Sequence, residues 1–561
     1  MNSADSQPEL SARSGDGQAR QRALATLPPS LSAGPEGGET VTYRSAGCAL
    51  VVGPMEAAVA AADRLRDALD MYVLVTDGTG GDIAHPDAGT LGARVLRAQR
   101  IATRGHLGGF SITVQSRQGE TDLATKFGFA ASEGFDLVLD LDDPVGLPQQ
   151  KLPPGYFAPA DEPALDAAIG EMTELLGEFE KPRYFEYRGE LCAHGARGQT
   201  GCSRCIEACA TGAIHSAGDL IEVDPYLCQG CGSCATVCPS GAISYAWPAA
   251  ETVVDALRRL LRQYRDSGGK RPTVLFHDGE TGAAAVTAWA GDLPESVLPV
   301  TVEDVGALGL EVWLAALAYG AGAVYLLIPP ATPAAERAAT EAQIGHAQAI
   351  LGGLGYPADR IATVTPADGL GLQAAEPLVA EPATFAGLGG KREVHGHALR
   401  HLRAAAPGPV QAQPLAPDAP FGAIEVDGEA CTLCMACVSV CPPGALIGGG
   451  ADPRLLFRED RCVQCGLCAP TCPEDAITLV PRMDYAAHLE PGERVLNEEP
   501  MHHCPGCDKA FATRKVIERM EQRLAGHWMF QDETARQRLY LCEDCRIRSA
   551  MSADSDVTPY R

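Results

Sequence analysis

The chain has 561 residues, 45 of them basic and 72 acidic, so its formal net charge is −27 at pH 7. This length predicts several domains, each with enough apolar residues for its own core. The acidic balance opposes binding to nucleic acid or to an anionic membrane. It favours a protein partner with a basic docking patch, although acidity alone also serves solubility. No apolar run approaches the ~20 residues of a membrane-spanning helix, so we expect no membrane span.

Residues 1–40 are expected to form a disordered tail. They consist mainly of Ser, Gly, Pro and Gln with scattered arginines, and they contain no apolar core pattern. The segment fits neither a secretory signal nor a twin-arginine leader, because Gln21 separates Arg20 from Arg22 and no hydrophobic stretch follows. We therefore expect a cytoplasmic protein, whose thiols stay reduced and available to metals.

Residues 41–180 have the pattern of an α/β domain. The glycine-rich segment 77–82 follows a predicted strand, where α/β folds place ligand loops. It lacks the third glycine of a dinucleotide fingerprint, so a plain turn is the better interpretation. Cys48 is alone in an apolar run and is expected to be a buried, inert thiol. The predicted strands are Ala49–Val52, Tyr72–Thr76, Ser111–Val114 and Phe135–Leu139, with a helix at Met55–Leu69.

Sixteen of the 21 cysteines form four runs that are arranged as two pairs. Three runs have the spacing C-x2-C-x2-C-x3-C-P, which binds [4Fe–4S] clusters in bacterial ferredoxins. Each iron needs one soft thiolate, and closely spaced cysteines let a single loop reach three corners of the cube. Disulfides would need an oxidising compartment, and zinc sites rarely crowd three thiolates in this way. Iron–sulfur binding is therefore the interpretation that the spacing favours.

The two pairs closely resemble two modules of the bacterial 2×[4Fe–4S] ferredoxin family, at residues 181–247 and 421–482. In that family, the fourth cysteine of each run serves the other cluster of the module. The resemblance therefore implies four [4Fe–4S] clusters with crossed ligand sets. In the first module these sets are Cys192, Cys202, Cys205 with Cys238, and Cys228, Cys231, Cys234 with Cys209. In the second module they are Cys431, Cys434, Cys437 with Cys472, and Cys462, Cys465, Cys468 with Cys441.

Short segments near the runs extend this resemblance, and two features depart from it. Ala210 stands where proline follows the other runs, and nine residues rather than two separate Cys192 from Cys202. The family spacing favours Cys192 as a ligand, while a three-iron cluster or a different ligand stays open there. Triplets of the Gly-Ala-Ile kind begin predicted hairpin strands at 212–214, 241–243, 444–446 and 475–477, with facing strands at 220–224 and 424–427.

Residues 248–366 alternate between predicted strands and helices, which implies a small parallel sheet covered by helices. The architecture resembles the δ-subunit-like domain of methyl-viologen-type hydrogenases and heterodisulfide reductases, but the cysteines for a [2Fe–2S] centre are absent. We therefore expect a docking platform rather than a redox site. Residues 367–420 are expected to be a linker with a short basic helix at Lys391–Arg403. The predicted strands are Thr273–Phe276, Ser296–Val302, Ala323–Ile328 and Ile361–Val364, and the helices are Glu251–Arg265, Gly282–Ala290, Leu308–Tyr319 and Ala334–Leu354.

Residues 483–561 contain two separate C-x2-C pairs, Cys504 with Cys507 and Cys542 with Cys545. Two such pairs form a tetrahedral four-thiolate site of the structural zinc kind, and iron in a rubredoxin-like site would use the same ligands. The adjacent His502 and His503 could substitute as ligands. Because four cysteines already complete the site, we expect these histidines to be exposed on a loop.

The predicted fold class is therefore multidomain α/β plus α+β: two dicluster ferredoxin-like modules, two α/β domains and a small C-terminal metal domain. The layout resembles bacterial cytosolic 4Fe–4S proteins associated with molybdenum or tungsten formate dehydrogenases. The segments that carry this likeness are the two modules, the terminal C-x2-C pairs, Tyr184-Phe185-Glu186-Tyr187 and Cys192-Ala193-His194.

This resemblance implies a multicluster electron-transfer protein. It would pass single electrons between an oxidoreductase, such as formate dehydrogenase, and ferredoxin-type partners, and it would have no catalytic centre of its own. Two alternatives stay open. One is an accessory subunit of a flavin- or molybdenum-containing oxidoreductase complex, although no motif here supports a bound flavin. The other is a maturation or redox-sensing factor for such an enzyme.

Overall fold

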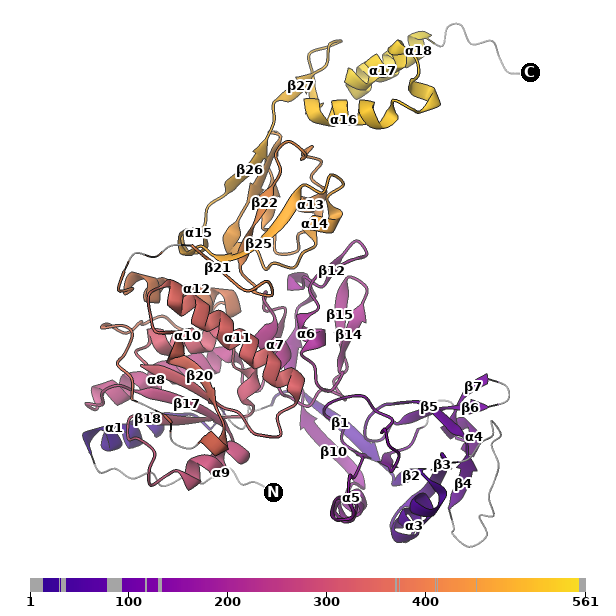
Figure 1. Ribbon diagram of the computed structural model, residues 1–561, viewed down its shortest axis with the longest axis vertical. Helices are drawn as coiled ribbons and strands as arrows, with labels where there is room; N and C mark the ends of the chain where they lie inside the picture. The colour runs from indigo at the N-terminus through magenta and orange to yellow at the C-terminus, as the bar shows by residue number, and fades with distance from the viewer. Residues whose placement is uncertain are drawn as a thin grey trace.

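Figure 1 shows the computed structural model, which has the mixed α/β architecture that the sequence predicts. The residues described are 14–29, 31, 37–77, 93–116, 119–129, 134–368, 371–372, 374–408, 410, 412–450 and 452–553. Of the predicted glycine-rich turn 77–82, residues 78–82 lie outside these ranges. The C-terminal helices lie at one end of the molecule, and the second cysteine-rich module lies between them and the remainder (Figure 1).

The region 41–180 contains a five-stranded parallel sheet with the order β4-β3-β2-β8-β9. Apolar side chains of β2 alternate between two cores, Val51 on one face and Leu50 on the other. The strands are β2 (Cys48–Gly53), β3 (Asp70–Val75), β4 (Arg94–Arg97), β8 (Leu137–Asp140) and β9 (Tyr156–Phe157). Around them are α3 (Met55–Leu65), α4 (Leu123–Phe127), α5 (Glu162–Glu174), an antiparallel sheet of β5 (Gln99–Arg104), β6 (Ser111–Ser116) and β7 (Gly119–Asp122), and the pair β1 (Thr40–Ser45) with β10 (Gly177–Pro182).

The region 248–366 contains a four-stranded sheet with the order β18-β17-β19-β20, in which every pair is parallel, as the alternating pattern predicts. Its strands are β17 (Thr273–Asp278), β18 (Val297–Val302), β19 (Ala323–Leu327) and β20 (Ile361–Val364). The helices are α8 (Ala250–Asp266), α9 (Thr281–Ala288), α10 (Leu310–Ala318) and α11 (Ala334–Gly353). Every residue of α10 is buried, which fits its apolar composition and its place inside this core.

The predicted linker 367–420 contains α12 (Lys391–Ala404), close to the basic helix expected at Lys391–Arg403. Its apolar stripe, which includes Val394, Leu399 and Leu402, is buried in the same core as α10. This part of the expected linker is therefore a structural layer of the molecule, because an amphipathic helix is stabilised by burying its apolar face.

The expected disorder of residues 1–40 is wrong for α1 (Gly15–Leu24). Ser14 caps this helix, and Ala19 and Ala23 are fully buried in the core that contains α8. Asp16 accepts hydrogen bonds from the Tyr264 hydroxyl at 3.1 Å and from the Lys270 amide at 2.8 Å. The sequence pattern missed α1 because its apolar stripe is short and is completed by residues about 250 positions away.

Both cysteine-rich modules consist of short antiparallel strand pairs and one-turn helices. In each, the residue that opens the strand after a cysteine run has a left-handed backbone, with φ of +65° at Gly212, +72° at Gly241, +62° at Gly444 and +49° at Asp475. Glycine and aspartate tolerate this conformation, which explains the shared triplets. The first module contains β11 (Phe185–Tyr187) paired with β16 (Ile243–Tyr245), β14 (Ile214–Ala217) paired with β15 (Leu220–Val223), α6 (Arg204–Glu207) and α7 (Ser233–Val237).

The second module continues into the C-terminal region through α15 (Tyr485–Leu489) and β26 (Arg494–Glu498). No helix in the described part of the chain has the length and apolar character needed to cross a bilayer. The second module contains β22 (Gly422–Val426), β23 (Leu446–Gly448), β24 (Arg454–Phe457), β25 (Ile477–Met483), α13 (Ala436–Ser439) and α14 (Cys468–Thr471). β25 also pairs with β21 (Gln413–Pro414), which belongs to the predicted linker. The C-terminal region contains the hairpin β27 (Met501–His503) and β28 (Ala510–Thr513), then α16 (Arg514–Leu524), α17 (Glu533–Gln537) and α18 (Glu543–Ala553).

Candidate metal centres

The second module contains two cavities, and each is lined by three cysteines of one run and the fourth cysteine of the other. The first cavity is lined by Cys431, Cys434, Cys437 and Cys472. The second is lined by Cys441, Cys462, Cys465 and Cys468. The remaining walls are largely apolar, including Leu455 and Ile477 in the first cavity and Leu446 and Phe457 in the second. These groupings are the crossed sets that the ferredoxin resemblance implies.

Local backbone structure places these cysteines. The Cys431 amide donates to Asp427 O at 2.9 Å, and the Cys462 amide donates to Glu459 O at 3.2 Å, so each run begins on a tight turn. Cys437 lies in the short helix α13, and Cys472 follows the end of α14. The third cysteine of each run therefore faces its own cavity from a helical turn, while the fourth is carried past that turn into the neighbouring cavity.

In the first module, the electrostatic neighbours of Cys205 and Cys234 follow the same crossed groups. Burial raises the pKa of Cys205 to about 12, with further contributions from its neighbours Cys238, Cys202 and Cys192. Burial also raises the pKa of Cys234 well above its ordinary value, with further contributions from Cys231, Cys228 and Cys209 and a smaller one from Cys205 of the other set. Each set therefore lies close enough for its thiolates to repel one another.

The nine residues between Cys192 and Cys202 fold into a small hairpin of β12 (Gly195–Ala196) and β13 (Gln199–Thr200). At its base, the Cys202 amide donates to Ala193 O at 3.0 Å, and buried His194 bonds to Cys202 O at 2.8 Å. The two ends of this insertion lie close together, so Cys192 stays beside Cys202 and Cys205 despite the long spacing. Cys192 also follows a one-turn 3-10 helix, Gly189–Leu191, as Cys462 follows Glu459–Arg461.

The donor sets fit [4Fe–4S] clusters. Each provides four soft thiolates in an apolar setting, which is the ligation that such clusters use. Burial raises the pKa of Cys437 to about 12 and that of Cys465 to about 11, so without a metal these groups stay protonated thiols. A bound cluster would supply the positive charge that holds the thiolate form. Gln464 Nε2 donates to Cys462 Sγ at 3.2 Å, the kind of hydrogen bond that tunes a cluster potential.

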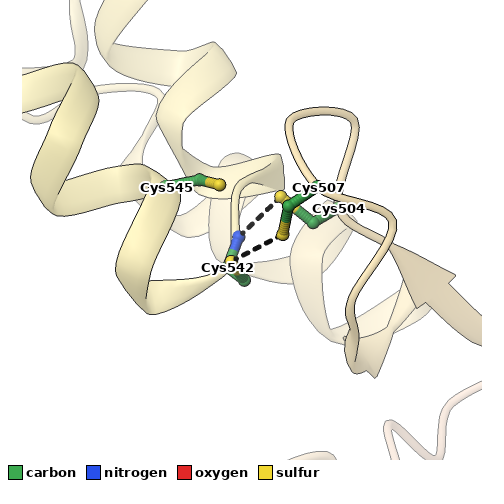
Figure 2. Close-up of side chains that lie close together, drawn as sticks. All are labelled: Cys504, Cys507, Cys542 and Cys545. Carbon is green, nitrogen blue, oxygen red and sulfur yellow. Dashed lines mark hydrogen bonds between the residues drawn. The ribbon is translucent and has the colours of Figure 1, made fainter.

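The C-terminal four-cysteine group is much tighter. Figure 2 shows Cys504 and Cys507 in the turn after β27 facing Cys542 and Cys545 at the beginning of α18. The four sulfur atoms lie within 4.8 Å of one another. A tetrahedral ion with ~2.3 Å metal–sulfur bonds places its sulfurs about 3.8 Å apart. This group therefore fits one metal ion, and the donor set suits zinc and iron equally.

The neighbouring histidines lie outside this set of ligands, although their predicted placement on a loop is wrong. His502 and His503 belong to strand β27, where they face opposite directions. His502 Nε2 lies 3.2 Å from Tyr540 O, and His503 is exposed with its Nδ1 3.0 Å from Asp508 O. Cys48 is half-buried on β2, where burial and the nearby Asp136 raise its pKa to about 12. That shift keeps it an unreactive thiol at neutral pH.

Sequence reasoning missed the basic residues beside the cysteines. Arg204 stands between Cys202 and Cys205, and its Nη1 lies 3.8 Å from Cys202 Sγ. Arg392 is half-buried at the beginning of α12 and donates to Cys462 O at 3.3 Å. The position of Arg204 within a cysteine run is a local signal that could have identified it. Arg392 lies 70 residues from Cys462 and has no such signal.

Comparisons with known proteins place the runs in one class. The 4Fe-4S binding domain matches residues 221–244 and 456–478, and a second family of the same description matches residues 423–446. These matches contain the runs that begin at Cys228, Cys431 and Cys462. The chain is thus an iron–sulfur protein with 4Fe-4S binding domains of the ferredoxin type.

Similar proteins include ferredoxin-1 of Caulobacter vibrioides, 43% identical over 51 residues, which are 9% of this chain and 43% of the relative. Pyruvate synthase subunit PorD of Thermotoga maritima is 40% identical over 57 residues, 10% of this chain and 57% of the relative. NADH-quinone oxidoreductase subunit I 2 of Streptomyces coelicolor is 34% identical over 93 residues, 13% of this chain and 47% of the relative. The chain thus spans about half the length of these relatives, and its cysteine-rich segments are similar to ferredoxins and to oxidoreductase subunits.

Proposed function

We propose that this protein is an electron carrier with four [4Fe–4S] clusters, two in each module. The observation that carries the proposal is the pair of cavities in the second module, each completed by a cysteine from the other run. The neighbouring cysteines in the first module support the same sets there. The clusters would supply one-electron chemistry, while the chain provides thiolates, apolar walls and hydrogen bonds.

The partners in this proposal are a cytoplasmic oxidoreductase and a ferredoxin-type protein. The net charge of −27 favours partners with basic docking surfaces. Cys434 is exposed, whereas the other fifteen cysteines of the four runs are buried or half-buried, so the cavity beside Cys434 is the natural point of exchange. Formate dehydrogenase is our first candidate for the oxidoreductase, on the resemblance of the whole layout to proteins associated with that enzyme.

The other regions have supporting roles in this proposal. The parallel sheet of residues 248–366 acts as a docking platform, because it contributes no cysteine of its own. The C-terminal site holds one structural metal ion, zinc or iron, because its four thiolate ligands suit either. The same proposal divides the chain into the tail 1–40, the α/β domain 41–180, the first module 181–247, the docking domain 248–366, the linker 367–420, the second module 421–482 and the C-terminal domain 483–561.

Metal analysis under anaerobic conditions tests the central claim. The purified protein should contain about sixteen irons and sixteen acid-labile sulfides, from four clusters of four, plus one further metal ion. About half that iron in protein never exposed to air would contradict the two-module assignment. An anaerobic pull-down with formate dehydrogenase tests the partner separately, since failure to bind would leave the cluster count unaffected.

A further inference from the structure

The cysteine loops of the two modules pack directly against each other. A Cβ atom at Gly201, just before Cys202, would lie 2.7 Å from Leu467 Cγ, so the backbone there is in close contact with Leu467. Leu467 is 1% exposed and lies between Cys465 and Cys468. The loop that begins at Cys202 therefore touches the loop that contains Cys465, although some 260 residues separate them in sequence.

Arg204 spans this contact. Its Nη1 lies 3.8 Å from Cys202 Sγ in the first module and donates to Val463 O of the second module at 3.3 Å. Its Nη2 donates to Asp418 O at 3.2 Å, which fixes the guanidinium on the second-module side. One cation thus lies between two cysteine sets.

Arg392 makes a second bridge from a different element, at the beginning of α12. Its Nη1 donates to Pro239 O, the residue after Cys238, at 3.2 Å. Its Nη2 donates to Asp460 O at 2.8 Å and to Cys462 O at 3.3 Å. The two arginines therefore connect one cysteine set of each module, the set that contains Cys202 and Cys238 and the set that contains Cys462 and Cys465.

We propose that the two modules form one continuous electron conduit, with direct exchange across this contact and with Arg204 as its positioning residue. The inference rests on the proposed function. One electron leaves the cluster held by Cys192, Cys202, Cys205 and Cys238, which is oxidised, and reduces the cluster held by Cys441, Cys462, Cys465 and Cys468. No bond breaks and no proton moves, and the oxidoreductase partner supplies the electron.

The position of Arg204 has an electrostatic consequence. Two reduced clusters with thiolate ligands carry negative charge and repel each other at short range, and a cation between them offsets that repulsion. Its hydrogen bond to Cys202 Sγ also stabilises the more negative, reduced state of that cluster. Along the conduit, the cluster that Cys209 completes comes first and the cluster that contains Cys202 comes second. The cluster that contains Cys465 comes third, and the cluster that contains the exposed Cys434 comes last.

Magnetic coupling between paired clusters tests the conduit. One variant keeps only the facing sets, through Cys231→Ala, Cys234→Ala, Cys434→Ala and Cys437→Ala. Its counterpart keeps only the outer sets, through Cys202→Ala, Cys205→Ala, Cys465→Ala and Cys468→Ala. Each should hold about eight irons, from two clusters. After reduction with dithionite, we expect spin–spin splitting in the electron paramagnetic resonance spectrum of the first variant and its loss in the second.

Two independent signals in the first variant, with eight irons present, would overturn the conduit and leave the proposed cluster content intact. Failure to bind iron in wild-type protein would instead contradict the proposed function. The full chain with Arg204→Gln gives a second measurement that does not depend on the cysteine variants. We expect unchanged iron content and a shift of the two facing clusters to more negative midpoint potentials, with partial recovery in Arg204→Lys.

The matched control for Arg204→Gln is Arg262→Gln, which removes a cation from the exposed face of α8 that pairs with Asp266 at 3.6 Å. It should leave all midpoint potentials unchanged. If Arg204→Gln also leaves the potentials and the spin coupling unchanged, Arg204 only packs the modules together and its positioning role is wrong.

Discussion

The two ferredoxin-like modules have the same cysteine arrangement but very different surroundings. In the first module, the run from Cys228 to Cys238 is contacted by three other parts of the chain. Lys181 Nζ donates to Cys228 O at 2.5 Å, Thr236 Oγ1 donates to Gly306 O at 2.7 Å, and Lys391 Nζ donates to Ala235 O at 2.7 Å. In the second module, the run from Cys431 to Cys441 leaves Cys434 exposed. The same cysteine spacing thus occurs in a run that other parts of the chain cover and in a run with one cysteine exposed to solvent.

This difference indicates that the surroundings of a cysteine run, rather than its spacing, determine its role in electron transfer. Cluster potentials depend on hydrogen bonds to sulfur and on solvent exposure, so the same four thiolates give different potentials in different surroundings. The covered run from Cys228 to Cys238 is suited to holding electrons within the protein. The run that contains the exposed Cys434 is suited to exchanging them with a partner.

The largest expected effect is the loss of one cluster through a single distant cysteine. Cys209→Ser should remove the cluster held by Cys228, Cys231 and Cys234, with about four irons lost, because Cys209 completes that set. Iron analysis and electron paramagnetic resonance would measure this. Cys48→Ser is the control and should retain all iron, since Cys48 lies on β2 in a separate core. Loss of the Cys202 signal instead would show that ligation is not crossed.

Removal of the C-terminal metal should have the next largest effect, and this effect should be limited to the C-terminal region. Cys542→Ser deletes one of the four sulfur ligands, and the small apolar core of that region consists of Cys504, Cys542 and Cys545 with Phe511 and Leu541. The region should therefore unfold, because binding free energy of a structural metal is folding free energy. Limited proteolysis should cleave after residue 500 while the signals of the four clusters persist. Loss of a redox signal would identify the ion as iron.

Two features could be predicted because their signals are local: the 4Fe-4S cysteine runs, from their fixed spacing, and the parallel sheet of residues 248–366, from its strand–helix alternation. The hairpin between Cys192 and Cys202 could not be predicted. A nine-residue spacing alone does not show that His194 and Ala193 form hydrogen bonds with Cys202 and so hold the two cysteines close together. The contact between the two modules could not be predicted from the sequence either. Arg392 joins Pro239 and Asp460, which lie 153 and 68 residues away, and no local pattern encodes such a contact.

An acid-sensitive contact attaches the second module to α12. His395 stacks on Phe421 with ring centroids 4.8 Å apart, and His488 of α15 meets both rings edge-on. Burial, followed by the charge of Arg392, lowers the pKa of His488 to about 3. The folded protein therefore keeps His488 neutral, whereas the unfolded chain takes up a proton below pH ~6.5. Stability from this group is present above pH ~6.5 and is lost as the pH falls toward 3.

By pH 5, this proton uptake should lower the free energy of unfolding by about 2 kcal/mol. The variant His488→Phe retains an aromatic ring and removes the titration, so its urea midpoint should fall less between pH 7 and pH 5 than that of the wild type. The control is His215→Gln in the first module, an exposed residue on β14 whose side chain is 56% accessible. Equal acid sensitivity of the wild type and His488→Phe would show that other groups control the contact.

The smallest expected effect concerns the contacts that attach the C-terminal region to the second module. Glu474 lies two residues after Cys472, its side chain is 4% exposed, and it pairs with Arg519 at 2.8 Å and with Arg523 at 3.1 Å, both on α16. Glu474→Gln should reduce the stability of this attachment by about 1 kcal/mol, because the two arginines are themselves partly exposed to solvent.

A faster rate of proteolysis between the second module and α16 would reveal that loss. The matched control is Glu518→Gln, which removes an exposed pair with Arg514 on the outer face of α16 and should cost only a few tenths of a kcal/mol. If both variants are cleaved at the same rate, the attachment depends instead on the Lys515 Nζ bond to Gly428 O, at 2.6 Å. In that event the contact beside the exposed cysteine set is secondary, and the access of a partner to Cys434 is independent of the C-terminal region.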